Sequence, residues 1–229
     1  MSDKQEVMQD NQALAKAQGF WQQYQKIIIG GIAAVVIGFG GWFAYGEFIV
    51  KPKEEKAAEA LFKAEEYFRI DSSNLALNGD GQSRGALYVI KNFSGTKAAN
   101  LAHYYAGISY LKLGDFNNAV KYLKDFSTDA QQIQLLAFGA LGDAYAELGK
   151  TDDAVSYYKK AGTIFEKDDS NSAEYLFRAA LLLETKGKTA EALELFKEIQ
   201  TKYPKTDKGF QADRYIYRLS IEKNDLGAN

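Results

Sequence analysis

The longest apolar stretch of the chain runs from Ile27 to Gly46, twenty residues without a charged side chain. Because a helix rises about 1.5 Å per residue, about 20 apolar residues are enough to cross a hydrocarbon core of roughly 30 Å. Aromatic residues, which often lie at the level of the lipid headgroups, stand at both ends: Trp21, Tyr24, Trp42 and Tyr45. The pattern predicts a transmembrane helix within residues 27–50, preceded by an N-terminal tail at 1–26.

Two other structures would also contain an apolar stretch. A helix buried in a protein core is one alternative, although such helices are usually shorter. A cleaved signal peptide is the other, but its apolar region should span about 7 to 15 residues and end near a small-residue cleavage site. The run from Ala58 to Ala60 lies well past this stretch, inside a helical pattern. We therefore expect an uncleaved signal anchor and a single-pass membrane protein.

Small residues recur at every fourth position within the predicted span, at Gly30, Ala34 and Gly38. Such a face lets two transmembrane backbones approach each other and pack. We expect a packing face for a partner helix here. The alternative is that glycine is simply frequent in membrane helices.

One spaced pattern occurs three times in the middle of the chain: a small residue, a bulky residue three positions on, a glycine seven on and an alanine twelve on. The copies are Gly107, Tyr110, Gly114 and Ala119; Gly142, Tyr145, Gly149 and Ala154; and Ala180, Leu183, Gly187 and Ala192. They follow one another at 35 and then 38 residues. This period, with glycine between two amphipathic stretches, predicts stacked helical hairpins. The small residues let two helices approach closely, and the turn glycine supplies a left-handed conformation.

These copies resemble the tetratricopeptide repeat family. Nearly the full family pattern is present in the second copy, at Phe138, Leu141, Gly142, Tyr145, Gly149, Ala154, Tyr158 and Ala161. The outer copies depart from it, with Phe126 and Ile199 where a small residue is usual, and the third copy keeps the helix-stopping Pro204. The resemblance implies an all-α fold with three repeats at 97–206 in a helical-hairpin solenoid.

Residues 51–96 lie between the predicted anchor and the repeats. A helical stripe of apolar positions covers 54–70, and we expect it to continue from the span after a break at Pro52. Residues 74–85 have the composition of a loop. A short helix over 86–93 would then complete a degenerate first hairpin.

The C-terminal residues 207–229 are expected to form a capping helix, over 208–222, and a tail. Solenoids need such end pieces to cover the exposed face of the last repeat.

Composition argues against several kinds of function. The chain holds 28 basic and 30 acidic side chains and no cysteine. Without clustered Lys and Arg we expect no nucleic-acid partner. The lack of cysteine excludes disulfides, thiolate metal sites and cysteine nucleophiles. His103 is the only histidine, so neither a histidine metal cluster nor a histidine-containing triad can form.

Short motifs that resemble phosphate or calcium loops fail on spacing. Gly-Lys-Thr occurs at 149–151 and 187–189, but the glycine that a P-loop needs five residues earlier is replaced by Ala144 and Leu182. The turn at 78–81 lacks the alternating oxygen ligands of a calcium loop. We therefore expect no catalytic residue, no cofactor, no metal and no small-molecule substrate.

The family resemblance implies protein binding, because stacked hairpins form a concave surface lined by the first helix of each hairpin. The inward positions implied are Tyr104, Ile108, Leu111, Asp143, Glu147, Phe177, Leu181 and Glu184. Apolar side chains rimmed by acids suit an amphipathic or extended polypeptide better than a small polar metabolite. The alternative is that the Tyr and Phe residues pack between repeats. A subclass that clamps chaperone C-termini uses Lys, Asn and Arg side chains, and Arg178 is the only counterpart of these in this chain.

The order of tail, anchor and repeats resembles the YfgM-like inner-membrane proteins of Gram-negative bacteria. That resemblance implies an ancillary subunit of the Sec translocon that engages a PpiD-type membrane-anchored chaperone or emerging secreted proteins. It also implies a cytoplasmic N-terminus and a periplasmic repeat domain.

Two other functions remain open. An envelope-assembly adaptor unrelated to the translocon would have the same layout. A docking receptor with its repeats in the cytoplasm is favoured by the flanking charges, since basic residues are enriched on the cytoplasmic side of a span. Lys16 and Lys26 precede the span, whereas Lys51, Lys53, Lys56 and Lys63 follow it.

Overall fold

The computed structural model describes residues 2–222. Over this range the regular elements are helices, and the one bridge between extended residues joins Gly79 and Arg84. The predicted all-α class is therefore confirmed. The chain divides into two compact units, with the boundary between Lys53 and Glu54.

The first unit is helical. It contains α1 (Ser2–Tyr45) and η1 (Gly46–Val50), a π-helical turn, and it ends within the first turn of α2 (Lys51–Arg69). By length and composition, one described helical run, Leu14–Arg69, is able to cross a membrane. Its most apolar window has no buried residue, unlike the core helix of a soluble protein, which is mostly buried.

The expected break at Pro52 is wrong. Pro52 lies in the first turn of α2, and the irregular segment precedes it as the π-helical turn η1. Proline lacks an amide hydrogen, and its ring crowds the carbonyl four residues earlier, which is that of Phe48. A π-helical turn widens the backbone there, so helical geometry continues through the proline.

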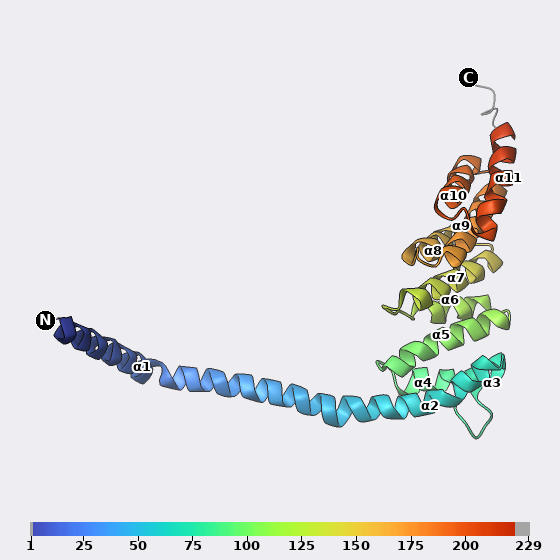
Figure 1. Ribbon diagram of the computed structural model, residues 1–229. Helices are drawn as coiled ribbons and strands as arrows, with labels where there is room; N and C mark the ends of the chain where they lie inside the picture. The colour runs from blue at the N-terminus through green and yellow to red at the C-terminus, as the bar shows by residue number, and fades with distance from the viewer. Residues whose placement is uncertain (1, 223–229) are drawn as a thin grey trace. The chain divides into compact units, whose positions relative to one another are not determined.

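The second unit is a stack of helices. In Figure 1 the helices α5 to α11 follow one another along the stack in chain order. After α2, the elements are α3 (Ser73–Asn78), α4 (Ala86–Asn92), α5 (Lys97–Lys112), α6 (Phe116–Lys124), α7 (Gln131–Glu147), α8 (Thr151–Ile164), α9 (Asp169–Thr185), α10 (Thr189–Lys202) and α11 (Asp207–Glu222).

The loop expected over 74–85 is wrong in its first half. The Asn-rich segment forms α3, because Ala76 and Leu77 are buried there at 0% and 2% exposure. Tertiary burial thus outweighs the weak helix propensity of asparagine. The irregular part is confined to residues 79–85, where Gly79 and Gly81 have positive φ.

The three hairpins are α5–α6, α7–α8 and α9–α10. Their turns contain Gly114, Gly149 and Gly187, with φ of 78°, 68° and 73°. An L-residue rarely adopts this conformation, so glycine ends the first helix of each hairpin at low cost. The left-handed turns predicted from the repeat pattern are confirmed.

Small residues allow the two helices of a hairpin to touch. A Cβ added at Gly107 would overlap Leu123 of α6, and one added at Gly142 would overlap the Tyr158 ring of α8. The alanines of the pattern are fully buried on the second helices: Ala119, Ala154 and Ala192. Close packing of this kind holds each hairpin at one fixed spacing.

We predict that Gly142→Ala destabilises the repeats. The added methyl forces the Tyr158 ring to move, and overpacking of this kind costs about 1–3 kcal/mol. Urea unfolding of the full chain in detergent, followed by circular dichroism, measures the change. Ser156→Ala, at an exposed position of α8, is the control and should unfold at the wild-type urea concentration. Equal midpoints for the two variants would contradict this account of the hairpin contact.

Candidate polypeptide-binding site

The helices α2, α5, α7, α9 and α11 form one surface, here called the A-helix face. Glu54 of α2 accepts the Lys97 N–H of α5 at 2.9 and 3.0 Å, and the Phe68 and Tyr105 rings lie 4.7 Å apart. From the first contact to the second, the residue numbers increase along both helices, so α2 and α5 run parallel. The neighbours α5 and α7 also touch, as do α9 and α11.

The predicted residues of α5 lie on this face but are partly packed. Tyr104, Ile108 and Leu111 are half-buried against the main hydrophobic cluster. The Tyr104 ring lies 5.2 Å from that of Phe126 and 6.4 Å from that of Phe68. Tyr104 thus helps to join α2 to the repeats as well as lining the face.

Phe177 is buried, as in the alternative that the aromatic residues pack between repeats. Only 3% of it is exposed, because the rings of Phe196 and Tyr215 lie 5.3 and 5.1 Å away. Tyr215 belongs to α11, so the terminal helix covers the position that would be inward-facing and open in a longer solenoid. Leu181, one turn further along α9, is partly buried, whereas Glu147 of α7 is exposed.

Two of the acidic side chains predicted to line the groove form ion pairs with basic residues of the same chain. Arg178 Nη1 lies 2.7 Å from Asp143 Oδ1, and the Tyr158 hydroxyl donates to the same oxygen at 2.7 Å. Glu184 Oε1 lies 2.7 Å from Arg218 Nη2 of α11. The negative charge predicted for the groove is therefore largely neutralised in the second and third repeats.

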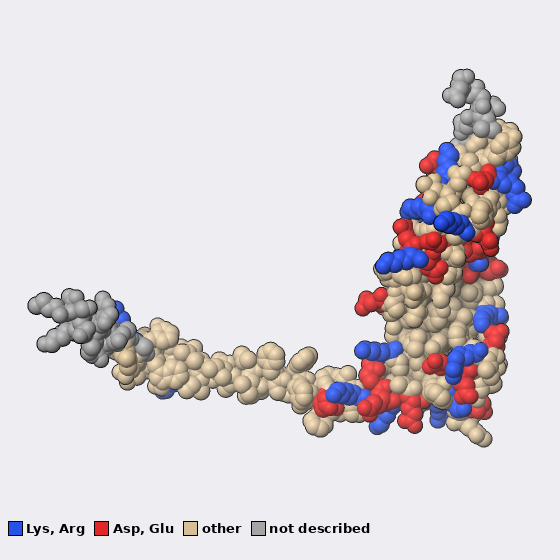
Figure 2. All heavy atoms as spheres, viewed as in Figure 1, with Lys and Arg blue, Asp and Glu red and all other residues tan. Residues whose placement is uncertain are grey.

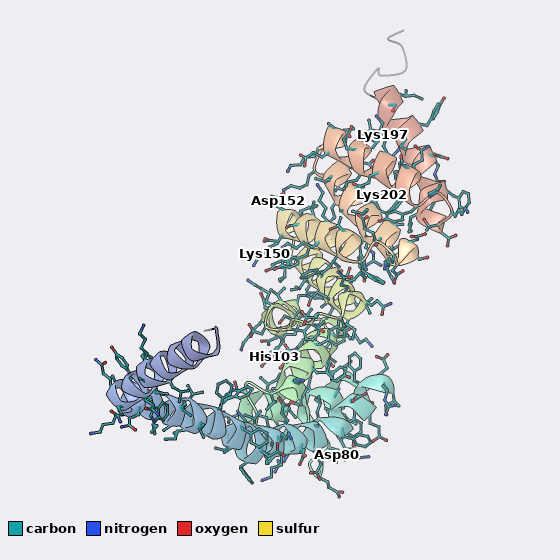
Figure 3. The ribbon with its side chains drawn as sticks, turned by 60° about the vertical axis from the view of Figure 1, so that its left-hand side comes forward. Asp80, His103, Lys150, Asp152, Lys197 and Lys202 are labelled. Carbon is teal, nitrogen blue, oxygen red and sulfur yellow. The ribbon has the colours of Figure 1, made fainter. Side chains whose placement is uncertain are left out.

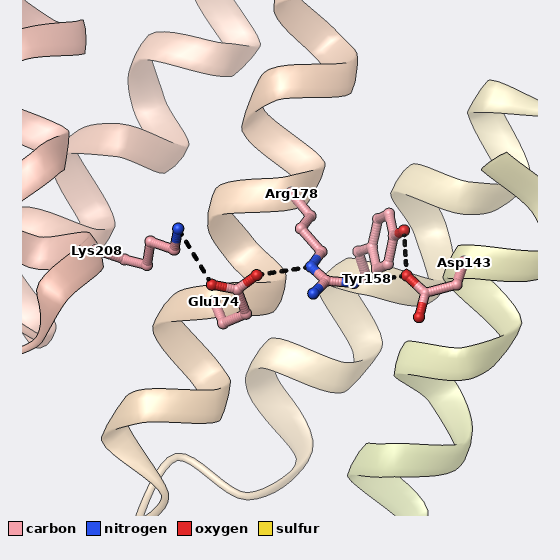
Figure 4. A network of polar contacts seen from close by, with 5 residues as sticks. All are labelled: Asp143, Tyr158, Glu174, Arg178 and Lys208. Atoms are coloured by element: carbon pink, nitrogen blue, oxygen red, sulfur yellow. Dashed lines mark hydrogen bonds and ion pairs between the residues drawn. The ribbon is translucent and has the colours of Figure 1, made fainter.

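A polar network crosses from α7 to α11 (Figure 4). In it, Arg178 Nε donates to Glu174 Oε1 at 2.7 Å, and Lys208 Nζ lies 3.3 Å from Glu174 Oε2. Burial alone would raise the pKa of Glu174, but the hydrogen bonds and charges of Arg178 and Lys208 lower it overall. Burial, and then the hydrogen bond to Asp143, raise the pKa of Tyr158, which keeps the hydroxyl protonated as a donor.

Tyr175 fills the face between α7 and α9. A Cβ added at Gly139 of α7 would overlap the Tyr175 ring, so the ring lies directly against the α7 backbone. Burial raises the pKa of Tyr175 to about 12. The pairing of Gly139 with Tyr175, about one repeat apart, is a sequence signal that pattern analysis missed.

The apolar open part of the A-helix face lies at its N-terminal end. A hollow of about 450 Å³ is lined by Glu54, Glu55, Ala58, Leu61, Phe62, Glu65, Lys97, Ala98 and Leu101. We call this the N-terminal hollow. Phe62 is 58% exposed beside it. A second hollow, of about 310 Å³ between α9 and α11, has a polar lining: Ser170, Glu174, Thr206, Asp207, Lys208 and Gln211. In the sequence, one apolar stripe was assigned to residues 54–70, and the second stripe, at 54, 58, 62 and 65, which also follows helical spacing, was not singled out.

Charge is distributed unevenly over the second unit. On the face shown in Figure 2, charged side chains gather over α2 to α4 and over α8 to α11, whereas the middle of the stack is largely uncharged. At the C-terminal end Asp143, Glu174 and Glu184 have basic partners, as described above. No described residue forms an ion pair with Glu55 or Glu65 at the N-terminal hollow.

Residues that suggested other chemistry have structural roles (Figure 3). His103 lies on α5 beside Tyr122, and burial lowers its pKa. Asp80 accepts backbone N–H groups of its own turn and the Tyr67 hydroxyl. Lys150 and Asp152 lie where α8 begins, so the Gly-Lys-Thr motif is a hairpin turn. No group of three potential metal ligands occurs among the residues that the structure describes.

The small-residue face of α1 is open in this chain. Gly30 and Gly38 have no atom within 4 Å of an added Cβ. Packing of Gly30, Ala34 and Gly38 against a partner helix stays a prediction.

Comparison with known families agrees with the hairpin geometry. The family model described as a tetratricopeptide repeat-like domain matches residues 18–141, more than half of the chain. The chain belongs to the tetratricopeptide repeat-like domain family. A second model, described as a tetratricopeptide repeat, matches residues 133–205. This fold is a protein-interaction scaffold that is typically non-enzymatic.

Solved structures share the fold at low identity. One is the crystal structure of a putative kinesin light chain from Podosopora anserina, whose TPR-like repeats are nearly identical to one another. Its sequence is 16% identical to this chain, and the TM-score is 0.52. A second crystal structure, of a substituted form of the same repeats, is 15% identical, with a TM-score of 0.51. Each match covers 73% of this chain and 86% of the other. No curated protein matches the chain.

We predict that Arg178→Gln lowers the free energy of unfolding by about 1 kcal/mol, because it leaves Asp143 and Glu174 without their shared partner in a half-exposed setting. A double-mutant cycle with Asp143→Asn should show coupling of at least about 0.5 kcal/mol. The matched control is Lys186→Gln. Its partner Asp152 is 72% exposed, so that variant should unfold like the wild type. Strictly additive effects of the Arg178 and Asp143 variants would contradict the network.

The network should also make stability depend on acid pH. The pKa of Glu174 is lower in the folded state than its ordinary value of 4.5. Ionised Glu174 therefore adds stability above the unfolded pKa, and this contribution is lost as the pH falls through the folded pKa. The difference in urea midpoint between wild type and Arg178→Gln should be full at pH 6 and smaller at pH 3. A difference that stays constant over this range would show that Glu174 is not the titrating partner.

Proposed function

We propose that this protein is a membrane-anchored, non-enzymatic scaffold that binds other polypeptides. The observation that carries the proposal is the union in one chain of an exposed apolar helix and a tetratricopeptide-like stack. The helix supplies the anchor, within residues 27–50, and the stack supplies the binding surface. The open N-terminal hollow supports a binding role, because it leaves apolar surface at the A-helix face without a partner from the chain.

The more specific function that we propose is that of an ancillary subunit of the Sec translocon in a bacterial inner membrane. Its tail, at 1–26, would lie in the cytoplasm, and its linker hairpin, repeats and cap, at 51–96, 97–206 and 207–229, in the periplasm. There it would engage a PpiD-type chaperone or emerging secreted proteins. The support is the order of the parts along the chain, which resembles the YfgM-like proteins.

A second candidate is a docking receptor whose repeats face the cytoplasm. The observation that favours it is the set of lysines after the span, at Lys51, Lys53, Lys56 and Lys63. Positive charge on one side of a short-tailed span biases that side toward the cytoplasm, although large domains are translocated largely regardless of charge. An adaptor in envelope assembly would share the periplasmic orientation but not the translocon.

Protease accessibility distinguishes the two orientations. With a tag at the C-terminus, we expect digestion once the outer membrane alone is permeabilised, because the repeats would then be reachable from the periplasm. A cytoplasmic protein carrying the same tag is the control and should be digested only after lysis. Protection of this protein until lysis would overturn the periplasmic proposal and favour the docking receptor.

Co-purification from detergent-solubilised membranes tests the translocon itself. We expect Sec subunits and a membrane-anchored chaperone to be retained by the full chain, and to be lost when the repeats are destabilised by Gly142→Ala. Recovery of cell-wall or outer-membrane assembly factors without any Sec subunit would favour the envelope adaptor.

A further inference from the structure

The N-terminal hollow differs from the rest of the A-helix face in what covers it. Toward the C-terminus, Tyr175 lies over Gly139, α11 covers Phe177, and Asp143 holds Arg178. These positions are filled by the chain's own side chains. Between α2 and α5 the surface is open, with a volume of about 450 Å³. That volume is within the range of sites that take up small ligands or single bulky side chains.

We propose that the N-terminal hollow binds the partner, and that the bound segment is a polypeptide stretch that combines a bulky apolar side chain with neighbouring lysine or arginine. This inference rests on the proposed scaffold function and narrows it to one site and one kind of sequence.

The apolar part of the hollow matches one half of such a segment. Its floor is Leu61, only 4% exposed, and its sides include Ala58 of α2 and Leu101 of α5. Phe62 stands beside it with 58% of its surface exposed. A phenylalanine with this much exposure is stabilised when an apolar side chain covers it. Aromatic residues at the edge of a pocket are typical anchors of protein interfaces.

The charge of the hollow matches the other half. Its lining contains Glu54, Glu55 and Glu65 against the single basic residue Lys97. The Glu54 carboxylate is held by the backbone N–H at the start of α5. Glu55 and Glu65 form no ion pair among the side chains that the structure describes, so they are free to attract a cation. Complementary charge would steer a basic segment to the hollow and fix its register.

The same charges argue against a lipid in this position. Lipid headgroups are neutral or anionic, and anionic headgroups are repelled by three neighbouring glutamates. A small polar metabolite is also disfavoured, because the lining offers mostly apolar atoms and few groups that would fix its orientation. A basic, partly apolar polypeptide complements both the apolar floor and the acidic rim of the hollow.

Leu101 shows how such a segment would continue along the A-helix face. Leu101 and Leu136 both lie six residues before the opening glycine of their repeats, at Gly107 and Gly142. They therefore occupy equivalent positions on α5 and α7. Leu136 is 40% exposed. An extended segment with its anchor in the hollow would meet this second apolar position on the next A helix.

The binding test uses the full chain in detergent and three fluorescent twelve-residue peptides. The first carries Leu and Phe at its centre, followed by two Arg; the second replaces both Arg by Glu; the third replaces Leu and Phe by Ser. We expect the first peptide to bind at least tenfold more tightly than either of the others. We also expect its affinity to fall as salt is raised from about 50 to 500 mM, because ions screen the exposed glutamates.

Substitutions in the hollow, each with a matched control elsewhere on the protein, test whether the peptide binds there. Phe62→Ser and Glu65→Lys should each weaken binding of the first peptide at least fivefold. Phe210→Ser removes a phenylalanine of similar exposure, 68% on α11 against 58% for Phe62, and should leave binding unchanged. Glu194→Lys makes the same charge change as Glu65→Lys at an exposed position of α10, away from the A-helix face, and should have less than a twofold effect. Circular dichroism of each variant checks that the repeats remain folded.

The outcomes separate this inference from the scaffold function. If Glu147→Lys and Ile108→Ser weaken binding while Phe62→Ser does not, the hollow is not the site, but the protein is still a polypeptide-binding scaffold. If the Glu-substituted peptide binds as tightly as the first, the proposed partner chemistry is wrong. If no peptide binds and the full chain retains no protein partner from membranes, both proposals fail. If a photo-crosslinker at position 62 labels phospholipid rather than the peptide, the hollow binds a lipid and the proposed polypeptide ligand is wrong.

Discussion

The close approach of two helices through a residue without a side chain is the constraint on which the rest of the fold depends. Leu123 lies where a side chain at Gly107 would be, and Tyr158 lies where one at Gly142 would be. A glycine with positive φ then turns the chain back in each hairpin. The third hairpin has the small, fully buried Ala180 at the equivalent position. Because all three hairpins pack closely and turn in this way, the first helices come to lie on one side and form the A-helix face.

The regular spacing also determines which charges meet. Arg178 and Asp143 are 35 residues apart in sequence, Lys186 and Asp152 are 34 apart, and Lys202 and Glu166 are 36 apart. Each pair therefore joins nearly equivalent positions of successive hairpins, at the period of the repeat. Such pairs contribute little stability individually when exposed. The half-buried network around Arg178 is different, because it also holds α7, α9 and α11 in register and occupies the surface that a ligand would otherwise reach.

This occupation gives the A-helix face two unlike ends. Toward α11 it is covered by aromatic rings and neutralised acids, whereas toward α2 it is open, apolar at its floor and acidic at its rim. The open end is built partly by α2, which begins directly after the apolar stretch in the sequence. In the proposed function, the binding residues would therefore lie close in sequence to the membrane anchor.

The sequence by itself determined the apolar stretch, the three hairpins and their turns, because these depend on periodicity and on glycine at fixed positions. It also suggested which helices line the binding face. Only the tertiary structure decided which residues on that face are accessible. Phe177 is covered by Tyr215 of α11, Asp143 is neutralised by Arg178, and Phe62 remains exposed. The physical reason is that a side chain's burial depends on what stacks over it, and here those groups come from helices one or more repeats away in the chain.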